Sequence, residues 1–81
     1  MKKAWLSGVV LAVALAAGSA NAAVTVVGGG FARGCYLAAV QDNSDADSLR
    51  TCNLALSEQP LNQTNRAATL VNRGIIYLNR N

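Results

Sequence analysis

Two cysteines and a run of three glycines are the residues of this 81-residue chain whose types and spacing could do chemistry. Cys35 and Cys52 have no histidine in the chain to act as a base, so neither thiol is predicted to be a catalytic nucleophile. Two thiols without a histidine are also too few to hold a zinc ion. We therefore predict no catalytic residue, no metal site and no cofactor, and a protein that is not an enzyme.

The glycine run, residues 28–30, follows a β-branched stretch and precedes an apolar one, which looks like the start of a dinucleotide-binding unit. The spacing departs from that motif because Gly34 comes one residue late, and no second strand pattern follows to complete a parallel sheet. A cofactor-binding enzyme fragment is therefore the least supported alternative. We expect residues 23–34 to form a glycine-rich leader, either a short strand with a turn or a mobile segment.

The first residues of the chain predict export. Lys2 and Lys3 precede an apolar run over residues 4–17, and residues 18–22 end in the small-x-small pattern of a signal-peptidase site. The apolar run is shorter than the roughly 20 residues that a membrane-spanning helix needs. We expect residues 1–22 to be a signal peptide that is cleaved after Ala22 and touches the membrane only transiently. The product would be periplasmic or secreted.

Export decides how residues 23–81 are interpreted. The formal net charge of the chain is +3, but Lys2 and Lys3 belong to the signal, so the remainder is nearly neutral and gives no support to nucleic-acid binding. Outside the cytosol, pairs of thiols tend to persist as disulfides. A Cys35–Cys52 bridge would close a loop of about 17 residues and contribute on the order of 3 kcal/mol in the chain-entropy model. Such a contribution is large for a domain of this size.

Residues 35–81 are predicted to be helical, which makes the fold class all-α. Residues 35–40 favour a short helix, and residues 42–45 form a loop with capping side chains. A second helix should begin near Asp45 or Asp47 and end at Glu58, shortly before Pro60. Its expected core-facing stripe consists of Leu49, Cys52, Ala55 and Leu56.

The third helix is the clearest, with Thr64 or Asn65 as the expected N-cap. Its apolar residues recur at helical spacing over three turns: Ala67, Leu70, Val71, Gly74, Ile75 and Leu78. We expect this stripe to pack on the neighbouring helices but to be wider than they can cover. Part of it would then stay in water and favour self-association or binding to a protein partner.

Residues 48–81 resemble tetratricopeptide repeats. Residues 72–77, Asn-Arg-Gly-Ile-Ile-Tyr, are similar to part of the first helix of such a repeat, and an alanine followed five residues later by proline is similar to the end of a second helix. The matching packing positions are Ala55, Pro60, Leu70, Gly74 and Tyr77. The stretch from Pro60 to Gly74 is longer than the family pattern. The resemblance implies antiparallel helical hairpins with an incomplete last repeat, in an N-terminal fragment or truncated member of the exported bacterial tetratricopeptide-repeat proteins.

The same resemblance implies a non-enzymatic, exported adaptor or scaffold that binds protein. Asn72 stands where many such repeats place an asparagine that holds the backbone or terminal carboxylate of a partner, and the alternative is that Asn72 is simply solvated. A second function class also remains open. It is a small, self-contained secreted protein of binding or inhibitor-like type, held by its single disulfide.

Overall fold

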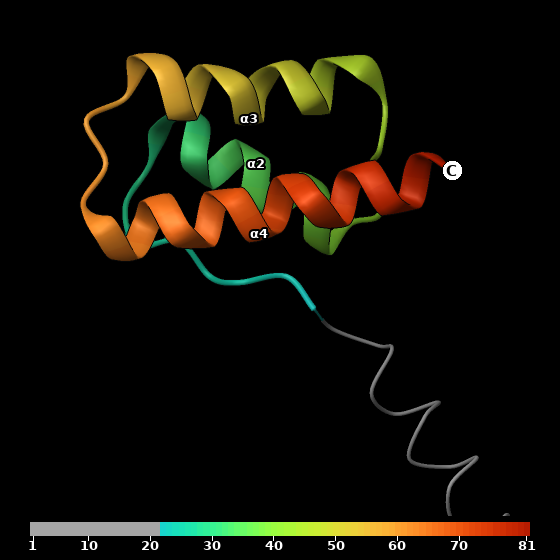
Figure 1. Cartoon of the computed structure of the whole chain (residues 1–81), viewed down its shortest axis with the longest axis horizontal. Coiled ribbons are helices and arrows are strands. Elements are labelled where there is room, and N and C mark those ends of the chain that lie inside the picture. Colours follow the sequence, from blue (N-terminus) through green and yellow to red (C-terminus); the bar gives the residue numbers. More distant parts are fainter. Residues whose placement is uncertain (1–21) are drawn as a thin grey trace, which may run out of the picture.

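The computed structural model describes residues 22–81, which form three α-helices and the extended segment before them (Figure 1). α2 spans Gly30–Val40, α3 spans Ala46–Glu58 and α4 spans Gln63–Arg80. No strand occurs in this described part, so the predicted all-α class is confirmed. The predicted export signal lies outside the described residues except for its last one. Among the described helices, none combines the length and hydropathy that crossing a membrane would require.

The three helices all pack on one another. α3 and α4 run antiparallel, and in Figure 1 α2 lies between them. The predicted disulfide between Cys35 and Cys52 is confirmed: it joins α2 to α3 with a Cα–Cα distance of 4.8 Å. The same two helices approach closely at Gly34, where an added Cβ would lie 2.9 Å from the Thr51 Cγ2 methyl group.

The core consists mostly of small side chains, and the largest apolar side chains in it are Ile76 and Val26. Small residues allow three short helices to lie close together and to bury their backbones. The buried small residues are Ala32, Cys35, Ala38, Ala39, Cys52, Ala55 and Ala68.

α3 begins where the sequence predicts because Asp45 caps it. The Asp45 carboxylate accepts a hydrogen bond from the backbone N–H of Ser48 at 2.8 Å. This N–H stabilises the charged carboxylate and lowers the pKa of Asp45 below its ordinary value, and the Ser48 hydroxyl and the positive charge of Arg80 act in the same direction.

α4 begins earlier than predicted. Asn62 is its N-cap, with a side-chain oxygen that accepts from the backbone N–H of Asn65 at 2.8 Å, so the expected cap at Thr64 or Asn65 was wrong. Asparagine is as good a cap as threonine or better, and the first turn can therefore include residues 63–65.

α2 also begins early, at Gly30 rather than at Cys35. The side-chain amide of Gln59, at the end of α3, supplies the missing cap: its Oε1 accepts from Ala32 N–H at 2.8 Å and its Nε2 donates to the Gly29 carbonyl at 3.0 Å. Gly30 has a φ of +73°, and a Cβ there would lie 2.9 Å from the Gln59 Nε2 atom. A side chain at this position would be strained by the positive φ and would displace the Gln59 amide. A residue distant in sequence thus fixes the first turn of α2.

α3 buries part of its predicted face, whereas α4 buries a different face from the one predicted. The buried residues of α3 are Ser48, Cys52 and Ala55, while Leu49 and Leu56 are only half-buried. The buried residues of α4 are Ala68, Thr69, Asn72 and Ile76. Most of the apolar stripe predicted to pack inward on α4 therefore points outward, and of that stripe Ile75 is the residue that packs against the core.

Candidate functional site

Because α2 already begins at Gly30, the leader predicted over residues 23–34 is shorter than expected; from here on the leader means residues 22–29, whose main chain is hydrogen-bonded to side chains of α4. Asn72 has no exposed surface, and its side chain exchanges two hydrogen bonds with the main chain of Val24: the Val24 N–H donates to Oδ1 at 2.8 Å, and Nδ2 donates to the Val24 carbonyl at 2.8 Å. The alternative that Asn72 is solvated was therefore wrong. Asn72 holds an extended backbone, that of its own chain.

A second asparagine repeats this arrangement one heptad earlier. The Val27 N–H donates to Asn65 Oδ1 at 3.1 Å, and Asn65 Nδ2 donates to the Val27 carbonyl at 2.7 Å. Between the two clamped residues, Val26 is buried among alanines of all three helices. Residues 22–29 do not form the short strand that was one of the two expectations, and side chains of α4 supply hydrogen-bond partners to their main chain.

The asparagines also explain why α4 turns its apolar stripe outward. The main-chain N–H and carbonyl groups of Val24 and Val27 need partners where they meet the helix, and leucine or valine could not provide them. The inward face of α4 is therefore the one with Asn65 and Asn72, and the apolar residues occupy the opposite side.

We call that opposite side the outer face of α4, and it is formed by Ala67, Leu70, Val71, Gly74, Tyr77 and Leu78. Leu78 is 76% exposed, and Leu70, Val71 and Tyr77 are between 44% and 48% exposed. Gly74 lies in the middle of this surface, and a Cβ built on it would have no atom within 4 Å. Glycine is a poor helix former, so its presence at this position lowers the stability of α4. No contact within the described fold requires a glycine there.

Three arginines at heptad spacing follow the edge of α4 that faces α3. Arg66 donates to the Leu56 carbonyl at 3.2 Å, Arg73 to Asn53 Oδ1 at 2.9 Å and Arg80 to the Ser44 carbonyl at 2.7 Å. Each of these acceptors is neutral, and Arg80 in addition acts through its charge on the Asp45 carboxylate.

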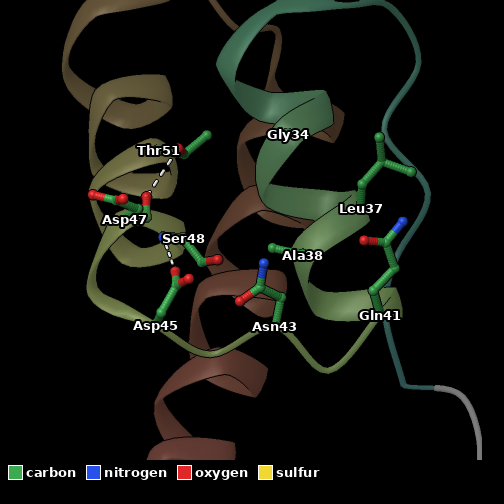
Figure 2. Close-up of a pocket in the computed structure, with 9 residues that line it drawn as sticks. All are labelled: Gly34, Leu37, Ala38, Gln41, Asn43, Asp45, Asp47, Ser48 and Thr51. Carbon is green, nitrogen blue, oxygen red and sulfur yellow. Dashed lines mark hydrogen bonds between the residues drawn. The ribbon is translucent and has the colours of Figure 1, made fainter.

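A shallow pocket of about 230 Å³ opens between α2 and α3 (Figure 2). Two of its polar side chains have partners inside the protein: Asp45 accepts from the Ser48 N–H, and the Thr51 hydroxyl donates to the Asp47 carbonyl. The pocket contains neither a histidine nor a thiol. Asp45 and Ser48, which line the pocket, form the capped start of α3.

Neither a metal centre nor a dinucleotide site is built from the described residues. No three potential metal ligands of the histidine, cysteine, aspartate or glutamate type lie together in this part of the chain. At the start of α2, where a dinucleotide-binding fold would place a pyrophosphate, the amide of Gln59 occupies the helix end.

The residues predicted from the repeat resemblance lie in two places. Ala55 is fully buried between the helices, and Pro60 is exposed in the connection from α3 to α4. Leu70, Gly74 and Tyr77 lie together on the outer face of α4. Sequence reasoning did not identify Gln59 or Asn65 as clamping residues. The signal for Asn65 was available, since it stands one heptad before Asn72.

Comparison of the chain with protein-family models, with curated proteins and with solved structures finds no match.

Proposed function

We propose that this chain is an exported, non-enzymatic helical-repeat module of tetratricopeptide type that binds protein as an adaptor or scaffold. The outer face of α4 is its docking surface. The observation that supports this proposal most directly is an apolar helix face that stays exposed in a protein whose other helices already enclose a core.

The free energy available at this face is substantial. Burying one leucine or valine side chain is worth roughly 1.5 to 3 kcal/mol, and several such side chains lie within three turns of α4. An exposed apolar surface of this kind is typical of a protein–protein contact. The described helices do not cover it, and we take its partner to be another helix or another chain.

Gly74 supports a helix as the partner. A residue without a side chain, placed between Leu70 and Leu78, leaves a notch into which a second helix can pack closely. Glycine on an exposed helix face lowers the stability of the free protein. The absence of a side chain at Gly74 would allow the backbone of a partner helix to approach closely, which would account for the glycine. The arginine edge beside the notch matches a partner helix that carries carboxylates on one flank.

The proposal is tested by adding a helix to the chain that can pack on the outer face of α4. A consensus second helix of a tetratricopeptide repeat is fused after Asn81 of the disulfide-bonded chain 23–81, and urea unfolding is followed by circular dichroism. We expect the fused helix to raise the free energy of unfolding. Leu70→Glu and Gly74→Leu should abolish that gain, since one removes apolar surface and the other fills the notch.

The matched control is Ser57→Glu, which places the same charge at an exposed position of α3 and should leave the gain unchanged. Both outer-face variants should retain the helicity of the parent chain, because neither position contributes to the core. A fused helix that adds no stability, or whose gain survives Leu70→Glu and Gly74→Leu, would contradict the proposal.

A further inference from the structure

The outer face of α4 is symmetrical about Gly74. Leu70 and Leu78 stand four residues before and after this glycine. Val71 and Tyr77 stand three residues before and after it, and all four side chains are between 44% and 76% exposed. Symmetry of position is common on a helix, because residues three and four apart share a face. Here the side chains match as well, since leucine corresponds to leucine and the smaller valine to the larger tyrosine.

A twofold contact between two copies of the chain requires this kind of symmetry. In such a contact both copies use the same surface, and residue i of one copy meets residue j of the other while j meets i. Two α4 helices that cross antiparallel at Gly74 bring Leu70 of each copy to the level of Leu78 of the other. They bring Val71 of each copy to the level of Tyr77. The four side chains of each copy then form one apolar cluster with those of the other.

Gly74 lies at the point where the two helices come closest in this arrangement. A Cβ built on it meets no atom of the described residues within 4 Å. Packed helices lie about 8 to 10 Å apart, depending on the side chains at the contact, and glycine on both sides of the crossing allows the short end of this range. The glycine that weakens α4 in a single chain therefore has a packing role in a pair.

The distribution of charge favours an antiparallel pair over a parallel one. Three of the four carboxylates of the chain lie just before α3 or in its first turn: Asp42, Asp45 and Asp47. Arg80 donates to the Ser44 carbonyl, so this acidic segment lies beside the C-terminal end of α4 (Figure 1). The other end of α4 has Arg66 in its first turn and the positive end of the helix dipole. Antiparallel pairing places that positive end near the acidic segment of the second copy, whereas parallel pairing brings the two acidic segments together.

We propose that the outer face of α4 binds a second copy of this chain, in an antiparallel, twofold-symmetric dimer centred on Gly74. The dimer rests on the proposed function, in which this face is a docking surface, and supplies its occupant. One helix from each copy forms the contact, which places it at the small end of specific interfaces, below about 1,200 Å² in total. The dimer is therefore weak and reversible.

The first test measures the mass of the disulfide-bonded chain 23–81 by sedimentation equilibrium, at protein concentrations up to about 1 mM, which reaches weak affinities. The mass should rise from that of a monomer to that of a dimer and no further, because a twofold contact is closed. Leu78→Glu should raise the dissociation constant about tenfold or more, since it brings a carboxylate into the apolar cluster. The matched control Ser57→Glu adds the same charge at an exposed position of α3 and should leave the constant unchanged.

A second variant separates association from folding. Gly74→Ala stabilises α4 of the free chain through helix propensity, but two methyl groups at the crossing hold the helices of a dimer apart. The variant should therefore have a higher urea midpoint at low protein concentration and a dissociation constant several-fold above that of the parent chain. A variant that is more stable and dimerises as well as the parent chain would place the contact elsewhere and overturn the inference.

Disulfide cross-linking tests the direction and register of the pair. A chain with Leu70→Cys is mixed with a chain with Leu78→Cys and oxidised; Cys35 and Cys52 are already bonded to each other. The mixture should link much faster than either variant alone, because like positions in the antiparallel register lie eight residues, about 12 Å, apart along the axis. Fast linking of Leu70→Cys to itself would indicate a parallel pair and overturn the inference.

The outcomes separate the dimer from the proposed function. The chain with the fused helix should be monomeric, because that helix covers the same face, and a dimer that persists after fusion overturns the inference. A parent chain that stays monomeric up to about 1 mM also overturns it, while a stabilising fused helix still supports a docking surface. If the fused helix adds no stability but the dimer has the expected register, the repeat-type function fails and the dimer stands.

Discussion

Gly34 and Gly74, the two glycines in helix interiors, should respond in opposite directions to substitution by alanine. At Gly74 nothing lies within 4 Å of an added Cβ, so Gly74→Ala should stabilise the free protein by about 0.5 to 1 kcal/mol through helix propensity alone. At Gly34 the added methyl group would lie 2.9 Å from Thr51 Cγ2. Overpacking of this kind costs about 1 to 3 kcal/mol, which outweighs the propensity gain.

The magnitude is large enough to measure. A change of 1 kcal/mol moves the midpoint of thermal unfolding by about 4 to 8 °C in a domain of 60 to 100 residues. Thermal and urea unfolding of the chain 23–81 should be followed by circular dichroism at low protein concentration with the disulfide intact. These measurements give the sign of the change in unfolding free energy for Gly34→Ala and for Gly74→Ala. A destabilising Gly74→Ala would refute the assignment of Gly74 to an uncovered surface, and a stabilising Gly34→Ala would refute the close contact between α2 and α3.

Three further results are expected. Replacing Cys35 and Cys52 with alanine should lower the free energy of unfolding by on the order of 3 kcal/mol, and urea midpoints that coincide with and without the disulfide would contradict this. Because hydrogen bonding at the helix cap lowers the pKa of Asp45, the cap stabilises α3 fully above the ordinary aspartate pKa and loses this effect as the pH falls through the lower, folded-state value; Asp45→Asn should flatten that part of the stability profile in an acid titration. Asn72→Ala removes two hydrogen bonds from a buried side chain and should cost about 2 to 3 kcal/mol, more than Asn65→Ala at its less buried site, and hydrogen exchange of the leader amides should report the loss; equal costs would speak against the difference in burial.

The ends of α3 and the disulfide, which depend on residue types and on residues close in sequence, were predictable. The start and end of α3 follow from Asp45, Glu58 and Pro60, which are neighbours of the helix ends. The disulfide followed from having two cysteines and a predicted export signal, since no other pairing within one chain was possible. These inferences needed no knowledge of how the helices meet.

Features that depend on distant residues were not predictable in the same way. The start of α2 is set by Gln59, and the inward side of α4 is set by the main chain of Val24, 48 positions before Asn72. Hydrophobic periodicity identified the amphipathic character of α4 correctly, but it assigned the apolar side to the core. A leader that brings unpaired main-chain groups to the helix reverses that assignment, and composition alone does not indicate where a leader will lie.

The distance along the chain between Val24 and Asn72 also imposes an order on assembly. Any process that releases the chain with its N-terminus first, such as synthesis or translocation, delivers the leader before the helix that holds it. Cys35 and Cys52 are separated by 17 positions, so their loop can close while α4 is still absent. The leader can be fixed only after α4 has formed, because Val24 and Asn72 are 48 positions apart. The segment that emerges first is therefore the last to be fixed in place.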